Sequence, residues 1–171
     1  MAKHYLIDVF GCVEPECRGP YSSFLSRDAA VAIVLALAVS ALGAEADVAK
    51  LFPGEYETIK EAAQANQCEG EMFIILLAIR KAESGPAGTE FGVLNPKAKD
   101  TNLRTQAGWA AATIVKNHVR WVKAGKPGEF TAFLAKRYCP IGAGNDPQGL
   151  NRHWERNVRW WTAKIKAAMQ T

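Results

Sequence analysis

Apolar residues recur at three- and four-residue steps through much of this chain, the spacing that places side chains on one face of an α-helix. The pattern is strongest in residues 71–83, EMFIILLAIRKAE, which also carry an acidic residue in the first turn and basic residues in the last. These charges match the ends of a helix dipole. Ser84-Gly85-Pro86 follows, and proline cannot continue a helix. The pattern therefore predicts a buried helix that ends at Glu83.

The same periodicity predicts further helices before and after this one. A moderately amphipathic helix is expected within residues 48–67, a long helix over residues 101–124, and a short one over residues 129–137. Asp146 is expected to cap a final helix with Pro147 at its first position. Apolar residues along that helix should close the core: Trp154, Val158, Trp161 and Ile165. We therefore expect a mainly α protein.

Residues 29–44 form an uncharged apolar run near the N-terminus. The run is shorter than the roughly 20 residues that span a bilayer, but it suits the apolar core of a signal peptide. Ala44-Glu45-Ala46 would then be the cleavage site. Residues 1–46 are accordingly predicted as a signal peptide or anchor, with membrane contact through 29–44, and residues 47–171 as the folded domain. A helix buried in the fold is the alternative for this run.

Composition narrows the classes of partner. The chain has 171 residues and a net charge of +4, which suits one domain with an added segment and a polyanionic partner. It has no run of Lys and Arg and no nucleic-acid motif, so we expect no nucleic-acid partner. The four cysteines and three histidines show no metal-ligand spacing, and we expect neither a metal site nor a cofactor.

Glu83 is the candidate for chemistry. A carboxyl at the exit of a buried helix, beside a loop of small residues, can be half desolvated and still reach a ligand. Desolvation disfavours the charged form, as a general acid near neutral pH requires. The alternative is an ordinary solvated residue at a helix end.

Residues 82–93 resemble the catalytic stretch of lysozyme-like peptidoglycan glycosidases. Glu83-Ser84 is similar to the Glu-Ser pair with which lytic transglycosylases end a buried helix. Bacterial N-acetylglucosaminidases of the same superfamily carry Glu-Ser-Gly and then Asn-x-Phe-Gly-Ile; this chain has Phe91-Gly92-Val93, with Thr89 in place of that Asn.

The C-terminal part carries a second resemblance. Those glucosaminidases have a Tyr-Ala-Thr-Asp-Pro loop that supplies an active-site Tyr. Tyr138 followed by Asn145-Asp146-Pro147 is similar, with a longer loop between them. The likeness as a whole covers about residues 70–162. It implies that residues 47–171 form a lysozyme-like helical domain built around a buried catalytic helix.

The resemblance also implies a function. It predicts an exported, periplasmic, extracellular or virion-borne enzyme, acting as a monomer, that cleaves the β-1,4 glycan strand of peptidoglycan. Glu83 would be the general acid and Tyr138 the second catalytic residue. Residues expected to bind substrate are Ser84, Phe91, Gly92, Asn145, Asn151 and Trp154. For Ser84 the alternative is a helix cap, and for Tyr138 a place in the core.

A second catalytic carboxylate is harder to assign. Glu90 is the nearest candidate, although we expect it at the surface, and Asp146 is expected to act as a helix cap. A single acid favours a transglycosylase-like or substrate-assisted route, in which the acetamido group of the substrate meets the cation. Two alternatives remain: an inactive lysozyme-like module that binds cell wall or forms part of a virion, and a small membrane-associated helical protein.

Cleavage after Ala46 would leave two cysteines, Cys68 and Cys139. One precedes the predicted catalytic helix and the other follows Tyr138. We therefore expect that, in an exported protein, these two would form a disulfide joining the two sides of the site, worth roughly 2–4 kcal/mol if unstrained.

Overall fold

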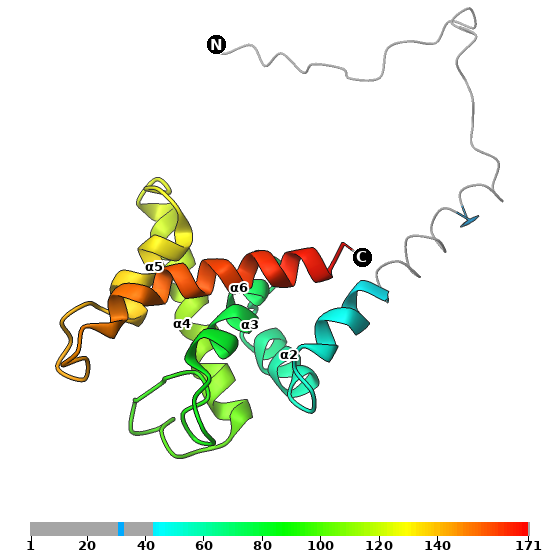
Figure 1. Cartoon of the computed structure of the whole chain (residues 1–171). Helices are drawn as coiled ribbons and strands as arrows, with labels where there is room; N and C mark the ends of the chain where they lie inside the picture. The colour runs from blue at the N-terminus through cyan, green and yellow to red at the C-terminus, as the bar shows by residue number, and fades with distance from the viewer. Residues whose placement is uncertain (1–30, 33–42, 171) are drawn as a thin grey trace, which may run out of the picture. The chain divides into compact units, whose positions relative to one another are not determined.

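The computed structural model describes residues 31–32 and 43–170. The chain divides into two compact units, Met1–Ala38 and Val39–Thr171, and the fold below is that of the second unit. Its elements are all helical in the described part, as the sequence predicts (Figure 1). In chain order they are α2 (Tyr56–Ala65), α3 (Glu71–Glu83), α4 (Leu103–Lys123), α5 (Phe130–Tyr138), the 3₁₀ turn η1 (Leu150–His153) and α6 (Trp154–Ala168).

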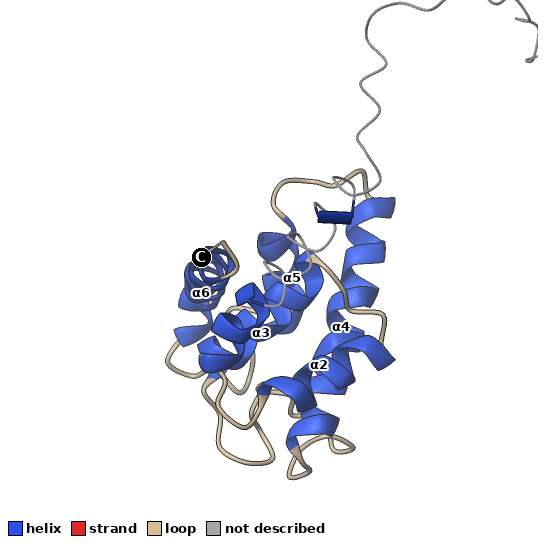
Figure 2. Ribbon diagram, turned by 90° about the vertical axis from the view of Figure 1, so that its right-hand side faces the viewer, coloured by secondary structure: helices blue, strands red, loops and turns tan. Residues whose placement is uncertain are grey.

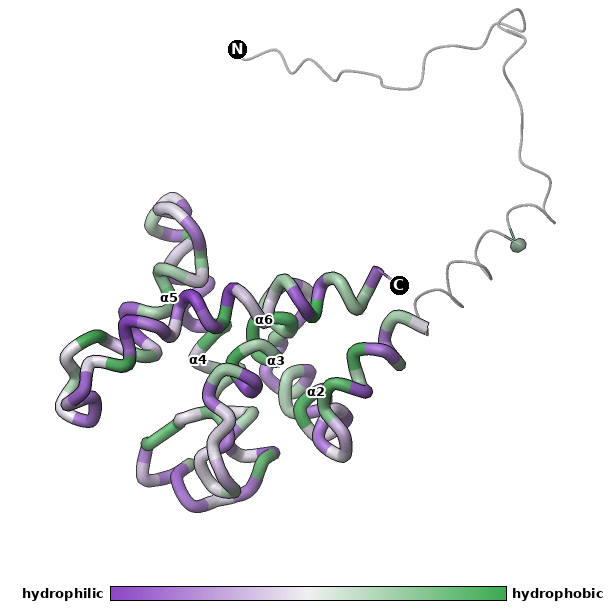
Figure 3. Tube along the Cα trace, in the orientation of Figure 1, coloured by the Kyte–Doolittle hydropathy of each residue, from purple (hydrophilic) through white to green (hydrophobic). Residues whose placement is uncertain are grey.

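Helix α3 is the centre of the unit, and α2, α4 and α6 pack around it (Figure 2). Five consecutive residues in its middle, residues 75–79, are buried, so the helix is enclosed on several sides. The hydropathy colouring shows the same concentration of apolar residues at α3 (Figure 3). The predicted bounds of this helix are confirmed. Burial on this scale provides most of the stabilisation of a helix that is too short to persist alone.

Helices α3 and α6 run antiparallel. Lys166 Nζ lies 2.7 Å from Glu71 Oε1 at the start of α3, while Trp154 Nε1 lies 2.7 Å from Glu83 Oε1 at its end. The first pair is exposed and contributes little to stability. The second pair brings the N-terminus of α6 to the C-terminal end of α3.

Helix α4 also packs against α3. The Asn102 side chain caps it by accepting a hydrogen bond from the Thr105 N–H at 2.9 Å. Its buried face is made of small and branched apolar residues, with the two polar residues Gln106 and Asn117 among them. The predicted ranges of α4 and α5 agree with the structure to within two residues at each end.

The start of the final helix differs from the prediction. The Asp146 carboxylate accepts hydrogen bonds from the N–H groups of Leu150 (2.6 Å) and Asn151 (3.2 Å), so it caps η1 and not α6. Gly149 has φ +65°, a left-handed conformation that interrupts any helix begun at Pro147. The helix α6 begins only at Trp154. Its predicted apolar side chains do lie in or against the core: Trp154, Val158, Trp161 and Ile165.

The predicted boundary between residues 46 and 47 lies within a helical stretch, residues 43–50. Val48 of that stretch is buried in the core, and Glu45 pairs with Lys60 of α2. Most of the apolar run 29–44 lies outside the described residues, so the signal peptide or anchor stays a prediction. In the part of the chain that the structure describes, no helix is both long and apolar enough to cross a membrane.

The expected disulfide is not formed. Cys68 is buried and Cys139 partly buried, and both are free thiols. Cys68 lies just before the first turn of α3, whereas Cys139 follows Tyr138, whose ring packs beside Trp154 at the last turn. A helix of 13 residues is about 20 Å long, and a disulfide needs Cα atoms within about 7 Å. The prediction was wrong because the two cysteines lie at opposite ends of the helix.

Candidate functional site

Glu83 ends the buried helix with its carboxylate held between two neighbours. Its Oε1 accepts the hydrogen bond from Trp154 Nε1 at 2.7 Å. Its Oε2 lies against Gly92, where an added Cβ would stand only 2.6 Å away. Gly92 also has φ +66°, a conformation that other residues rarely adopt. Glycine at this position therefore allows the loop to pass close over the carboxylate.

The surroundings of Glu83 favour its protonated form. Burial raises the pKa of the Glu83 carboxyl above its ordinary value of 4.5, and the hydrogen bond from Trp154 acts in the opposite direction. Burial has the larger effect, because a charged carboxylate loses more solvation than one N–H donor returns. Glu83 can thus hold a proton at a pH where a solvated glutamate would not.

Tyr138 lies beside this pair and supports it. Its ring stacks on the Trp154 ring, with centroids 5.2 Å apart and planes at 24°, and its hydroxyl donates to the Phe91 carbonyl at 2.8 Å. Burial, and then the nearby charge of Glu83, raises the pKa of Tyr138 well above its usual value. The phenol therefore stays protonated, and its proton is shared with the backbone of the loop that carries Gly92.

The structure thus brings together five of the predicted site residues: Glu83, Phe91, Gly92, Tyr138 and Trp154. Trp154 is buried and provides its indole N–H to the carboxylate. The Phe91 side chain is fully buried in the core, so this residue takes part through its carbonyl group and not through its ring.

Three other predicted residues have local structural roles or lie apart. Ser84 is exposed at φ +46°, and its hydroxyl donates to the Lys81 carbonyl at 2.8 Å, which is the helix-cap alternative. Asn151 donates its side-chain amide to the Pro140 carbonyl, also at 2.8 Å, and so closes the loop before η1. Asn145 is exposed on that loop. Within the described residues, no hydrogen bond joins either amide to Glu83.

Glu90 is buried, which corrects the expected surface position. Among the described residues its Oε2 has no hydrogen-bond partner. The loop that carries it turns inward, because Phe91 beside it enters the core and Gly85 approaches the backbone of Thr89 too closely to admit a Cβ. Glu90 therefore lies in the interior, with 6% of its surface exposed.

Gln106 of α4 is a site-supporting residue that the sequence analysis missed. Its Nε2 lies within 3.0 Å of three carbonyl oxygens, those of Gly88, Val93 and Ala98, and its Oε1 accepts from the Val93 N–H at 3.3 Å. It therefore fixes the loop that carries Gly92 to α4. The signal for it was present in the sequence as a polar residue in the apolar stripe of residues 101–124.

Two cavities adjoin the last turn of α3. One, of about 350 Å³, is lined by Ala82, Arg156, Asn157, Trp160 and Trp161, and we call it the α3–α6 cavity. The other, of about 300 Å³, is lined by residues of α3 and of the turn before α2: Phe52, Pro53, Glu55, Arg80, Lys81 and Ser84. Each cavity is lined by a residue next to Glu83 in the sequence, and neither is lined by Glu83 itself.

Among the residues that the structure describes, no group of three or more His, Cys, Asp and Glu side chains is arranged to hold a metal ion. No protein-family model matches the chain, and neither a curated protein nor a solved structure does. The proposal that follows is therefore argued from the geometry of the site and from the motif resemblance.

Proposed function

We propose that this protein is a lysozyme-like glycosidase that cleaves the β-1,4 glycan strand of peptidoglycan, with Glu83 as its general acid. One observation carries the proposal. The Glu83 carboxyl lies at the end of a buried helix, where burial raises its pKa and the indole N–H of Trp154 donates a hydrogen bond to it. A glycosidase needs such a carboxyl to give a proton to the leaving oxygen.

The steps follow from the contacts of Glu83. The protonated carboxyl donates its proton to the glycosidic oxygen as the bond from that oxygen to the anomeric carbon breaks. The carboxylate left behind keeps the hydrogen bond from Trp154, which favours the charged form. Tyr138 shares its own proton with the Phe91 carbonyl, so its role is to position Trp154 by stacking.

The group that stabilises the cationic carbon of the sugar is best supplied by the substrate itself. Both Asp146 oxygens are engaged with the N–H groups of Leu150 and Asn151, so this carboxylate is used in capping. The Glu90 side chain is buried, so it offers little surface to a substrate. The acetamido oxygen of the substrate can attack the cationic carbon without a second carboxylate. So can the 6-hydroxyl of the substrate, if its proton passes to the Glu83 carboxylate as the new bond forms. Both cases favour a substrate-assisted or transglycosylase-like route.

Digestion of purified cell wall tests the proposal. We expect the full-length protein, acting as a monomer, to clear peptidoglycan in a zymogram at some pH between about 5 and 8, around the neutral pH at which general acids commonly work. Mass spectrometry of the products then separates hydrolysis, which gives reducing sugars, from transglycosylation, which gives anhydro sugars. If no clearing occurs anywhere in this range, the enzyme proposal is wrong, and an inactive cell-wall-binding or virion module takes its place.

A further inference from the structure

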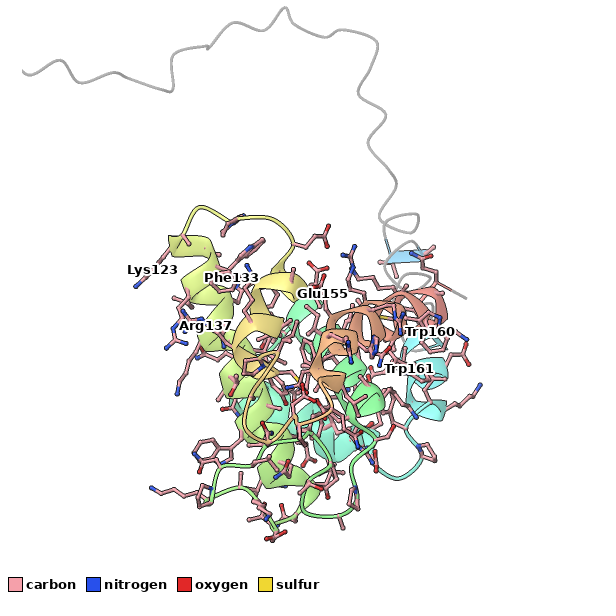
Figure 4. All side chains as sticks on the ribbon, turned by 60° about the vertical axis from the view of Figure 1, so that its left-hand side comes forward. Lys123, Phe133, Arg137, Glu155, Trp160 and Trp161 are labelled. Carbon is pink, nitrogen blue, oxygen red and sulfur yellow. The ribbon has the colours of Figure 1, made fainter. Side chains whose placement is uncertain are left out.

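The α3–α6 cavity is lined mostly by one face of α6. Its residues at positions 156, 157, 160 and 161 come from successive turns of the helix, and Ala82 of α3 forms the opposite side. Trp160 and Trp161 lie next to one another on α6, with ring centroids 4.7 Å apart at 83° (Figure 4). Trp161 packs against the core, whereas 51% of the Trp160 surface is exposed. Trp160 therefore offers aromatic surface to a ligand.

Neither Glu83 nor Trp154 lines this cavity, but both are close in sequence to residues that do. Ala82, which lines the cavity, is the neighbour of Glu83 in α3. Trp154, which is hydrogen-bonded to Glu83, lies one turn before Asn157 on α6. Trp154 and Trp161 are seven residues apart on α6, a distance of about 10 Å along the axis. A chain of sugars bound at Glu83 would therefore reach the cavity within a few residues of the scissile bond.

The charge of the cavity is positive. Among the described residues that line it, Arg156 alone is charged, and its guanidinium makes no ion pair or hydrogen bond with any of the described residues. Two more cations flank the paired rings: Lys81 Nζ lies 5.8 Å from the centre of the Trp161 ring, and Lys164 Nζ lies 4.4 Å from that of Trp160. The Arg156 side chain is exposed, and within the described part of the chain it has no partner. Such a guanidinium beside an exposed indole suits a ligand with both a carboxylate and a flat apolar face.

We propose that the α3–α6 cavity is a subsite for a carboxylate-bearing sugar, the N-acetylmuramyl residue of the glycan strand. Arg156 binds the carboxylate, Trp160 contacts the apolar face of the ring, and Asn157 provides an amide for its polar groups. The neutral N-acetylglucosamine residue lacks the carboxylate and gains nothing from Arg156. The assignment of the ligand as a sugar rests on the proposed function; the site itself rests on the cavity and its charge.

Calorimetric titration tests the subsite. The full-length protein carrying Glu83→Gln, which cannot process its ligand, is titrated with ligands of equal length. These are a neutral chitin tetramer, the peptide-free tetramer of alternating N-acetylglucosaminyl and N-acetylmuramyl residues, and the same tetramer with its peptides attached. We expect both tetramers that contain N-acetylmuramyl residues to bind about tenfold more tightly than the chitin tetramer. This difference corresponds to the free energy of one charge-assisted hydrogen bond. A preference shown only by the peptide-bearing tetramer places the recognised carboxylate on the peptide and overturns the muramyl assignment.

Matched variants in the same Glu83→Gln background locate the effect. Arg156→Gln should remove the preference and leave the affinity for the chitin tetramer unchanged, while Trp160→Ala should weaken all the tetramers. Arg159→Gln is the control, because Arg159 lies on the same helix, bonds to Glu155 at 3.4 Å and does not line the cavity. It should keep the preference intact.

The outcomes separate this inference from the proposed function. Equal affinity for all the tetramers, no binding of any of them, or a preference that survives Arg156→Gln overturns the subsite, even if the wild-type protein clears cell wall. An Arg156-dependent preference in a protein whose wild-type form clears no cell wall keeps the subsite and overturns the enzyme.

Discussion

At Glu83, two neighbours act on the pKa of the carboxyl in opposite directions. Burial raises it and the Trp154 N–H lowers it, with burial the stronger. The protonated form is the proton donor, so we expect the rate of cell-wall clearing to fall as pH rises through the raised pKa of Glu83. A pH–rate profile measures this decline. If the decline lies at the ordinary glutamate pKa, burial has no effect on the acid.

The same shift predicts a stability effect with a defined sign. Between the unfolded and the folded pKa of Glu83, the unfolded chain releases the proton first, so the free energy of unfolding decreases as pH rises through that window. The Glu83→Gln variant has no titrating group at this position, so its free energy of unfolding should not show this decrease. Denaturant unfolding of both proteins below and above the window measures the difference. An equal pH dependence in the two proteins would contradict the raised pKa.

Trp154→Phe tests the hydrogen bond separately from the stacking. Phenylalanine keeps an aromatic ring against Tyr138 but has no N–H for Glu83 Oε1. Because that hydrogen bond lowers the pKa of Glu83, its loss should raise the pKa further. The alkaline decline of the pH–rate profile should then move to higher pH. A decline that stays in place or moves to lower pH shows that Trp154 does not act on this proton.

Gly92→Ala tests the close approach of the loop to the carboxylate. The new Cβ would meet Glu83 Oε2 at 2.6 Å, so the carboxyl must move, and a displaced general acid should reduce activity by about 100-fold. Gly128→Ala is the matched control, since Gly128 has φ +64° and a Cβ added there would meet nothing within 4 Å. Both variants should lose about 1–2 kcal/mol of stability from backbone strain. Equal activity in the two variants would show that the contact with Glu83 has no role in function.

Gln106 shows how a helix and a loop are joined behind the site. It makes hydrogen bonds to Gly88, Val93 and Ala98, three points of one loop, from a fully buried position on α4. Gln106→Leu keeps the approximate size but removes all of these hydrogen bonds. The Gly88 and Ala98 carbonyls each keep a second donor, from Asp100 and Thr101, whereas Val93 loses its Gln106 partner at both its N–H and its carbonyl. The free energy of unfolding should therefore fall by about 2 kcal/mol. Gln64→Leu on the exposed face of α2 is the control, with a change of less than about 0.5 kcal/mol. Urea unfolding distinguishes the two, and similar values would contradict the role of Gln106.

The helices themselves could be predicted from local pattern. The bounds of α3 follow from its apolar steps and from Ser84-Gly85-Pro86, which act within a few residues. The start of α6 could not be predicted in this way. Asp146-Pro147 is a valid local start signal, but Gly149 adopts a left-handed conformation that depends on how the loop folds back onto its cap. Local signals rank the candidates for a helix start, and tertiary contacts select among them.

Contacts between residues that are far apart in the sequence could not be predicted from the sequence pattern. Glu83 was identified as the candidate acid from its place at a helix end, but its bond to Trp154 joins residues 71 positions apart. Glu90 was expected at the surface because charge alone suggests solvent, and only the inward turn of its loop buries it. The predicted disulfide was wrong for the same reason, because spacing along the chain does not say at which end of α3 each thiol lies.

The boundary of the folded unit is tested by truncation. Residues 47–171 retain Val48 and the buried helices, while residues 43–46 are exposed or half-buried. Removing residues 1–46 also deletes the Glu45–Lys60 pair, which is partly exposed and worth less than about 1 kcal/mol. We therefore expect the fragment to keep its helical circular dichroism and a cooperative unfolding transition. A fragment without helical structure would show that the preceding residues form part of the core.

The assignment of Glu83 as general acid is tested most directly by Glu83→Gln in a cell-wall clearing assay. Glutamine keeps the shape and can still accept from Trp154, but it has no proton for the leaving oxygen. We expect clearing to fall by at least ~100-fold, with unchanged circular dichroism. Glu57→Gln, at an exposed position in the first turn of α2, should clear at the wild-type rate. A folded Glu83→Gln protein that clears cell wall at nearly the wild-type rate would contradict the assignment.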